Sequence, residues 1–492
     1  MSINKNKILI IFLFITSISI YFILTIPSNS IWYDQLESIR ISKEILKGNF
    51  PLHGYKHSNG MYSFPAFYYL VAPLVYISEE PIFLYGSVAI FYILGVLILA
   101  NYTYNKFGPY ESFLFLFFSA THVWSLFFAS FFWNPNYTPL FMSLYIILLF
   151  KQINNGSSIL CFHLSGIILN IIIQMMPQAI VLIPAHAFIL FLFRSLPNFL
   201  NQLLHVFIQL LLVYPWIHFY LFILDWENHR TTGKIFKNFS AIFEYLNFLG
   251  GWELTSERIK DAYYGTITSP FQNIFESFLM LSSILLLVMI MYSIYLTFSK
   301  IKYINIFNLQ IELESGIDLG RQKLFMALSI INFSCIVFFI TGMHMTPHHY
   351  QFLTPLLALN MVLLASFKKL RKIFGPLLLF YILIQGSFSY WRAYSEYSKP
   401  YVTDIGYSEK FTNYFANQCN SGSTAYILNP EGLHSFKSYK KMIGRNACEK
   451  LILVMRDHYY QSEIIRWVLE KNYKITDMKF KDYQIWSSNK AL

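Results

Sequence analysis

Long apolar runs, separated by short polar segments, divide the first 390 residues of the chain. An α-helix needs about 20 mostly apolar residues to cross the hydrocarbon core of a bilayer. By this criterion, allowing for several shorter runs, the pattern predicts about eleven transmembrane helices and hence a mainly α, polytopic membrane protein. The predicted spans are Ile8 to Ile26, Pro81 to Tyr104, Glu111 to Phe131, Tyr137 to Phe150, Ser158 to Met175, Pro177 to Phe193, Leu200 to Leu224, Asn273 to Phe298, Leu324 to Met343, Tyr350 to Phe367 and Phe374 to Tyr390.

Basic residues at the ends of the spans predict the orientation of the protein. If the spans alternate in direction, these residues fall on one side, and an excess of Lys and Arg marks the cytoplasmic side. They are Lys5, Lys7, Lys106, Lys151, Arg194, the Lys300 to Lys323 loop, Lys368, Lys369, Arg371 and Lys372. The extracytoplasmic face is predicted to receive the Pro27 to Glu80 loop, the Trp133 to Asn136 turn, the Gln174 to Gln178 turn, the Asp225 to Gln272 loop, the His344 to His349 turn and everything after Trp391.

The first extracytoplasmic loop is too long for a simple connection. Its segment Leu36 to Leu46 is amphipathic, which predicts a helix lying on the membrane surface, and a second surface helix is predicted over Ala66 to Ile77. The span before the loop exceeds a typical signal-peptide core, so it is interpreted as a retained anchor. Ser28-Asn29-Ser30 leaves cleavage open as the alternative.

The chain changes character after residue 390. Charge rises, and short segments over Ala425 to Leu428, Lys450 to Met455 and Tyr483 to Ser487 predict strands around a helix near Gln461 to Lys471. We therefore divide the chain into a transmembrane domain, residues 1–390, and a small extracytoplasmic α/β domain, residues 391–492. Two cysteines of this second domain, Cys419 and Cys448, would pair on an oxidising face and stay free thiols in an anaerobic organism. The other two, Cys161 and Cys335, fall inside spans and are interpreted as apolar filler.

Composition supports the membrane assignment and removes one class of partner. The 492 residues are 55% hydrophobic, 19% aromatic and only 13% charged, with a mean hydropathy of +0.44. Soluble domains carry about 25% charged residues. A net charge of +11 would suit a nucleic-acid partner, but the basic residues lie in short clusters between apolar segments, as a topology signal does. Nucleic-acid binding is therefore not expected.

The candidate chemistry gathers on the extracytoplasmic face. Asp34 follows directly on the first span, and Glu37 and Lys56 lie in the same loop. Later turns on this face carry Trp133, Asn134, His344, His348, His349 and Tyr350. An acidic group held at a membrane surface is suited to general-base chemistry.

These residues resemble the GT-C glycosyltransferases of the protein O-mannosyltransferase and aminoarabinose-transferase type, over about Ile8 to Phe367. The resemblance has four parts: Asp34 after the first span, Pro65-Ala66-Phe67-Tyr68-Tyr69 in the surface loop, the turn Phe132-Trp133-Asn134-Pro135-Asn136, and His348-His349-Tyr350 with Pro355 opening a late span. Family members often show Asp-Glu where this chain has Asp34-Gln35, and many carry a His where Gln174-Met175-Met176-Pro177 stands. A second carboxylate or a metal ligand is therefore left open.

The resemblance implies a polytopic GT-C fold and transfer of a sugar from a polyprenyl-phosphate donor, in one step with inversion. A carboxylate can activate the weak acceptor nucleophile, and Asp34 is the candidate base. Fixed cations would stabilise the departing phosphate, and the candidates are His344, His348, His349, Lys56 and Arg230. The turn Trp133 to Asn136 is expected to close one side of the cavity. The acceptor is expected to be a lipid, a glycan or a protein. No metal is expected to be obligatory, and the use of a divalent ion is left open as the alternative.

Each candidate also has a simpler structural explanation. Asp34 can cap the helix that follows it, and Glu37 can pair with Arg40 or Lys43. The histidines of the His344 to His349 turn can contact phosphate, bind a metal or sit in the interfacial zone. Trp133 belongs by default to the aromatic belt, and Asn134 to a tight turn.

Three rival functions follow from the same architecture. A transporter or flippase for lipid-linked sugars would be expected to show matching halves and intramembrane charge relays, and the sequence shows neither. A polymerase or ligase of cell-envelope saccharides usually places its principal functional loop later in the chain, whereas in this chain the first loop carries the acidic residue Asp34. A receptor or scaffold would act through the C-terminal domain, which shows no recognisable site. We therefore expect a multi-pass glycosyltransferase of the inner or plasma membrane, with its site on the extracytoplasmic face.

Overall fold

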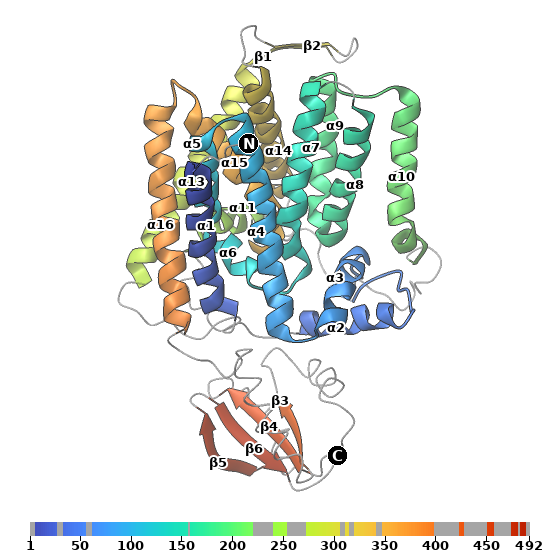
Figure 1. Ribbon diagram of the computed structural model, residues 1–492, viewed down its shortest axis with the longest axis vertical. Helices are drawn as coiled ribbons and strands as arrows, with labels where there is room; N and C mark the ends of the chain where they lie inside the picture. The colour runs from blue at the N-terminus through green and yellow to red at the C-terminus, as the bar shows by residue number, and fades with distance from the viewer. Residues whose placement is uncertain are drawn as a thin grey trace.

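The structure is a computed structural model that is mainly α-helical (Figure 1). It describes residues 5–26, 33–55, 62–155, 158–219, 240–252, 272–305, 310–313, 319–340, 347–397, 423–427, 450–456, 474–480 and 483–488. Its helices are α1 (Lys5–Thr25), α2 (Tyr33–Leu46), α3 (Ala66–Ile77), α4 (Pro81–Lys106), α5 (Pro109–Ser119), α6 (Val123–Ala129), η2 (Asn134–Tyr137), α7 (Thr138–Asn155), α8 (Ile159–Met175), η3 (Pro177–Val181), α9 (Leu182–Leu192), α10 (Phe199–His218), α11 (Ser240–Gly250), α13 (Gln272–Ser299), α14 (Leu319–Ile340), η6 (Pro347–Leu353), α15 (Thr354–Ser366) and α16 (Arg371–Tyr397). Its strands are β1 (Ile301–Asn305), β2 (Gln310–Leu313), β3 (Ser423–Ile427), β4 (Lys450–Arg456), β5 (Lys474–Phe480) and β6 (Tyr483–Ser488).

Each predicted span lies on one or two helices, and the mainly α membrane fold is confirmed. Within the described residues, six helices are long and apolar enough to cross a bilayer: α1, α4, α10, α13, α14 and α16. A seventh span is formed if α5 and α6 are counted together. The others, among them α7, α8 and α15, are not both long and apolar enough for a full span, so the count of eleven transmembrane helices is not confirmed.

Two predicted spans are broken. The single helix predicted over Glu111 to Phe131 is two helices, α5 and α6, bent by 67° at the break between them. His122 enables the break because its ring accepts a hydrogen bond from the Ser125 N–H and so caps α6. The span predicted over Pro177 to Phe193 begins as the short 3₁₀ helix η3 before α9.

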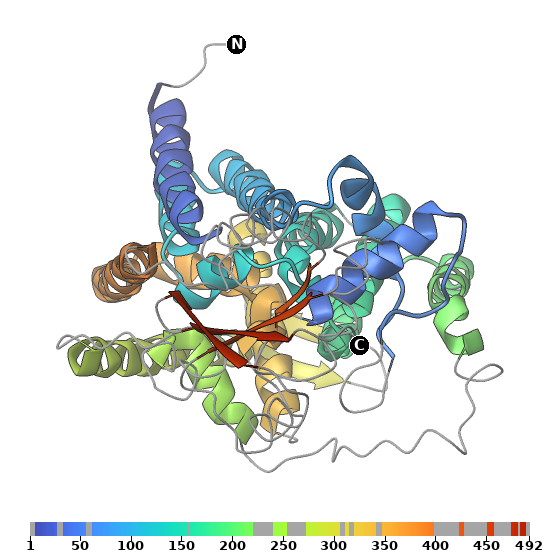
Figure 2. The ribbon, with the colours of Figure 1, turned by 90° about the horizontal axis from the view of Figure 1, so that it is seen from below.

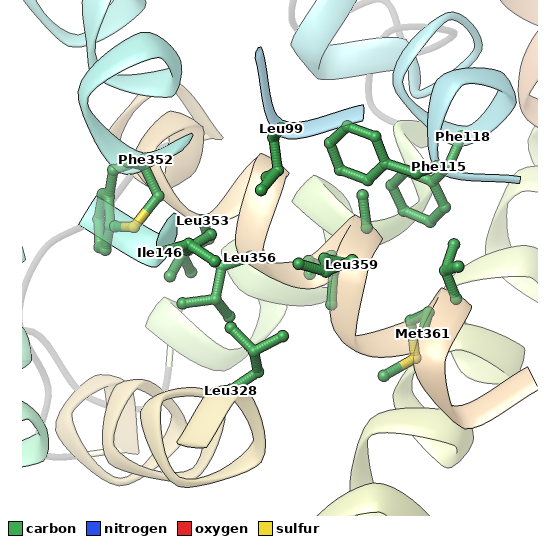
Figure 3. Close-up of a cluster of buried hydrophobic side chains, with 14 of the residues drawn as sticks. Leu99, Phe115, Phe118, Ile146, Leu328, Phe352, Leu353, Leu356, Leu359 and Met361 are labelled. Carbon is green, nitrogen blue, oxygen red and sulfur yellow. The ribbon is translucent and has the colours of Figure 1, made fainter. Parts of the chain in front are cut away.

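α15 forms the centre of the bundle. All thirteen of its residues are buried, so it is surrounded by protein and not by lipid. Figure 3 shows Leu356, Leu359 and Met361 among side chains of α4, α5, α7 and α14, including Leu99, Phe115, Phe118, Ile146 and Leu328. A helix that is mostly apolar on all sides is expected in such a place, and its buried polar side chains Thr354 and Asn360 are hydrogen-bonded to serines of neighbouring helices.

The two ends of the bundle carry different elements. The antiparallel hairpin of β1 and β2 lies at the end that the sequence assigns to the cytoplasm. α2 lies across the opposite end, roughly at right angles to the spanning helices, with α3 above it (Figure 1). The predicted helices Leu36 to Leu46 and Ala66 to Ile77 are thus present as α2 and α3.

The Asp225 to Gln272 segment was predicted as an outside loop, and this is wrong for part of it. α11 packs inside the bundle, with Asn247, Phe248 and Leu249 fully buried. A helix leaves its last carbonyls without partners of its own, and side chains of other helices bond three carbonyls at this end; the Asn247 carbonyl also accepts from the Gly251 N–H. The donors are Trp124 Nε1 to Asn247 O (2.9 Å), Tyr381 Oη to Leu249 O (2.7 Å) and Gln385 Nε2 to Gly250 O (2.8 Å).

α10 stands at the edge of the bundle beside α8, and none of its residues is buried (Figures 1 and 2). A row of polar side chains joins the two helices. Asn170 Nδ2 donates to Gln209 Oε1 (2.9 Å), Gln174 Nε2 donates to Leu212 O (3.1 Å), and the Nδ1 atoms of His163 and His205 lie 3.3 Å apart. Polar side chains of this kind hold helices together where lipid removes the hydrophobic driving force.

Gly166 of α8 allows α10 to pack closely enough for these polar contacts to form. A Cβ at this position would collide with the His205 ring. Small residues allow helix backbones to approach in a membrane. Gly166 therefore sets the distance between α8 and α10.

β3, β4, β5 and β6 form one sheet in the order β3-β4-β6-β5, with β3 and β4 parallel and the other pairs antiparallel. β3, β4 and β6 lie on the three predicted strand segments, and β5 was not predicted. The predicted helix near Gln461 to Lys471, Cys419 and Cys448 lie outside the described residues. The other two cysteines, Cys161 and Cys335, are free thiols in α8 and α14.

Candidate active site around Asp34

The packing of α2 against α3 places Asp34. Small and apolar residues of α2, including Ser38, Ile39 and Ser42, are buried against the first loop and α3. Ser42 Oγ bonds the Tyr68 carbonyl of α3 at 3.4 Å. Asp34 lies in the first turn of α2 and is largely buried, yet part of it remains exposed. The surroundings of its carboxyl group are therefore mostly protein.

A short stretch of the first loop brings Tyr55 to Asp34. The Gly54 N–H donates to Ser63 O (2.7 Å) and the Ser63 N–H donates to Tyr55 O (3.0 Å), so two strands of the loop are bonded like a small hairpin. The Tyr68 hydroxyl accepts from the Tyr55 N–H and contacts Ser63 Oγ at 2.7 Å. Gly54 is required here, because a Cβ would collide with Ser63 and Tyr68.

Asp34, Tyr55 and Trp133 form one hydrogen-bonded row. The Tyr55 hydroxyl is bonded to the Asp34 carboxyl group. Trp133 Nε1 donates to the same Tyr55 oxygen at 3.5 Å. Tyr55 is buried, while Trp133 is half-buried on the turn before η2.

The surroundings raise the pKa of Asp34 from 3.8 to about 6. Burial is the largest cause, because it disfavours the charged carboxylate. The hydrogen bond from Tyr55 acts in the opposite direction, and the nearby charge of Glu37 raises the pKa further. A carboxylate with a pKa of about 6 is ionised at neutral pH and is a stronger base than an ordinary aspartate, as a general base requires.

Glu37 is buried one turn further along α2 and is paired with a cation. Arg40 Nη2 lies 2.8 Å from Glu37 Oε2, and Arg40 Nε also donates to this oxygen at 2.8 Å. The pairing with Arg40 is one of the two that the sequence suggested. Its predicted contact with substrate stays a prediction.

The turn around Trp133 is fixed by its neighbour. Asn134 is buried and its Nδ2 donates to Met175 O at the end of α8 (2.7 Å). Asn136 Nδ2 likewise donates to Phe131 O (2.8 Å). Asn134 thus ties η2 to α8 and holds Trp133 over Tyr55, while its own substrate contact stays a prediction.

The late turn with the histidines lies beside η2, because η6 packs against it. His349 of η6 is half-buried. Tyr350 is fully buried and stacks on Phe248 of α11, with ring centroids 5.3 Å apart. This contact gives Tyr350 a packing role, and its predicted role in binding stays a prediction.

Four predicted residues cannot be placed in the site. Lys56, Arg230 and His344 lie outside the described residues, and His348 is described only as a member of η6. Within the described chain, no group of three or more His, Cys, Asp or Glu side chains is arranged to hold a metal ion. The expectation that no metal is obligatory stays a prediction.

Comparison with known proteins gives structural neighbours only. No family model and no curated protein matches the chain. Two solved structures of ArnT from Cupriavidus metallidurans are similar to this chain, one in the apo state and one bound to undecaprenyl phosphate. Each is 11% identical to this chain with a TM-score of 0.45, and each match covers 96% of this chain and 97% of the ArnT chain. The oligosaccharyltransferase of Archaeoglobus fulgidus in the apo form is 10% identical with a TM-score of 0.43, and the match covers 94% of this chain and 73% of that one.

Proposed function

We propose that this multi-pass membrane protein is a glycosyltransferase that transfers a sugar from a polyprenyl-phosphate donor to an acceptor on the extracytoplasmic face. The observation that carries the proposal is the environment of Asp34 at the α2 end of the bundle. Its carboxyl group is largely buried and hydrogen-bonded to Tyr55, and its pKa is raised to about 6. The sequence resemblance over Ile8 to Phe367 supplies the reaction class.

In the proposed reaction, an acceptor hydroxyl or amide attacks the anomeric carbon of the donor sugar. The new bond forms as the bond from this carbon to the phosphate oxygen breaks, and the bonding electrons leave with the polyprenyl phosphate. The proton of the acceptor passes to the Asp34 carboxylate. A single displacement inverts the configuration of the sugar and needs no covalent intermediate on the protein.

Negative charge on the departing phosphate needs fixed cations nearby. The proposed groups are Lys56 and Arg230 of the outside loops together with His344, His348 and His349. His349 is the one whose side chain the structure describes, and it lies in η6 beside the turn that carries Trp133. The site is proposed to work without an obligatory metal.

The membrane is proposed to be the inner or plasma membrane, with α2 and the C-terminal sheet on the extracytoplasmic side. Reporter fusions after Lys372 and after Trp391 test this topology, because the two positions flank the spanning part of α16. They should report opposite sides of the membrane. The same side for both would overturn the assignment.

The function is tested with the purified protein in lipid vesicles, supplied with polyprenyl-phosphate sugars extracted from its host. Release of free polyprenyl phosphate is measured with an acceptor extract. We expect Asp34→Asn to reduce the rate by about 10²-fold or more, since the general base is lost. Glu44→Gln is the control, because Glu44 lies on the same helix but is exposed and paired with Lys47.

Two outcomes contradict the proposal. Turnover of the Asp34→Asn variant at the wild-type rate removes Asp34 from the mechanism. Movement of the intact lipid-linked sugar across the vesicle membrane, without release of polyprenyl phosphate, would instead identify a flippase.

A further inference from the structure

Tyr55 occupies a position in which its hydrogen bonds have defined directions. An indole N–H can only donate and an ionised carboxylate can only accept, whereas a phenol does both. Trp133 Nε1 donates to the Tyr55 oxygen at 3.5 Å, so the phenol accepts from this side. Its single hydrogen is then available for the Asp34 carboxylate, to which Tyr55 is bonded.

The Tyr55 ring is held independently of Asp34. Its backbone is bonded to Ser63 and to the Tyr68 hydroxyl, and its side chain is buried among the aromatic rings between α3 and the Trp133 turn. The Tyr55 and Tyr68 rings meet edge to face with centroids 6.4 Å apart. A ring fixed in this way can impose an orientation on a carboxyl group one hydrogen bond away.

We propose that Tyr55 is the positioning residue of Asp34: its phenol proton holds the carboxylate in one orientation, and Trp133 directs that proton by occupying the other side of the oxygen. The proposal rests on the proposed function, in which Asp34 is the base. Trp133 acts through Tyr55, to whose hydroxyl its indole N–H donates.

This arrangement has a consequence for protonation that a purely structural contact lacks. Burial and the charge of Glu37 raise the pKa of Asp34, and the Tyr55 hydrogen bond lowers it. The phenol therefore keeps Asp34 ionised at a lower pH than burial alone would allow. Without the hydroxyl, the carboxyl group should hold its proton to a higher pH.

The test is Tyr55→Phe in the full-length protein, which keeps the ring and removes only the hydroxyl. Infrared spectra recorded across pH, each with the spectrum of the matching Asp34→Asn variant subtracted, report the protonation of Asp34 without any turnover. We expect the titration midpoint of Asp34 to move to higher pH in Tyr55→Phe. Tyr69→Phe is the matched control, because Tyr69 bonds the Pro51 carbonyl in the same loop at 3.0 Å.

The rate of sugar transfer gives a second readout. Tyr55→Phe should lose activity most on the acid side of the profile, roughly tenfold there, and recover part of it as the pH rises. Trp133→Phe, which removes only the indole donor, should give a smaller change in the same direction, and it carries the test if Tyr55→Phe does not fold. An unchanged titration midpoint in the folded variants would overturn the positioning role. A shifted midpoint in a protein that transfers no sugar would leave this role standing and refute the proposed function.

Discussion

Replacing Asp34 by Asn should make the protein more stable at neutral pH while greatly lowering its activity. The folded protein raises the pKa of Asp34 from 3.8 to about 6. Between these values the folded protein binds more protons at this site than the unfolded chain, so stability is lost as the pH rises through this window. An Asn carries no charge, and its side-chain oxygen can still accept a hydrogen bond from Tyr55.

The size of the gain follows from the pKa values. A difference of roughly two pH units corresponds to about 3 kcal/mol between the protonated and ionised forms. Asp34 keeps part of its surface exposed, so solvent reduces this value, and we expect a gain of about 1–2 kcal/mol above pH 6. Below pH 3.8 the gain should vanish, because Asp34 is then neutral in both states.

The assay is thermal unfolding of the wild type and of Asp34→Asn in the same detergent, compared over a series of pH values between about 4 and 8. The difference between the two midpoints should grow up to about pH 6 and then stay constant. A difference that is independent of pH, or a variant that is less stable than the wild type at pH 8, would refute the reasoning about the charged carboxyl group.

Two further predictions concern helix packing. Gly166→Ala places a methyl group against the His205 ring and should lower the free energy of unfolding by about 1–3 kcal/mol, and adding His205→Ala should restore it. Thermal unfolding of the single and double variants measures both effects, and a double variant that is not rescued would contradict the contact. Gln385→Leu leaves the Gly250 carbonyl and the Val123 N–H without their side-chain partner and should cost about 1–3 kcal/mol in the same assay, whereas an unaffected midpoint would show that the Gln385 contacts are unimportant.

The spans and the surface helices could be predicted because they depend on local pattern. The segments Leu36 to Leu46 and Ala66 to Ile77 are apolar on the faces that pack, and their ends agree with α2 and α3 within a few residues. The break at His122 could not be predicted, since neither Pro nor Gly occurs in the short connection between α5 and α6. The bend depends on a cap made by a side chain within an apolar run.

The burial of α11 was missed for a different reason. Its eleven residues are too few for a span, and the polar segments on both sides resemble an outside loop. Its place inside the bundle depends on Trp124, Tyr381 and Gln385, which lie more than a hundred residues away in the chain. No local pattern carries this information.

The candidate site was predicted in part. Asp34 stood out by its position after the first span, and Trp133 by the turn that resembles a known family. Tyr55 is one of 36 tyrosines and has no distinctive spacing, so no sequence signal marks it. Its role becomes visible only when the loop brings it between Asp34 and Trp133.

The side chains that bond the end of α11 have a consequence for how the protein is made. Trp124 is synthesised before α11, but Tyr381 and Gln385 belong to the last helix of the membrane part. Until the ribosome has delivered α16 to the membrane, the carbonyls of Leu249 and Gly250, which are buried in the finished bundle, lack these donors. A chain truncated before α16 should therefore be recognised as unfinished by quality-control proteases, and the last helix serves as the step that completes assembly.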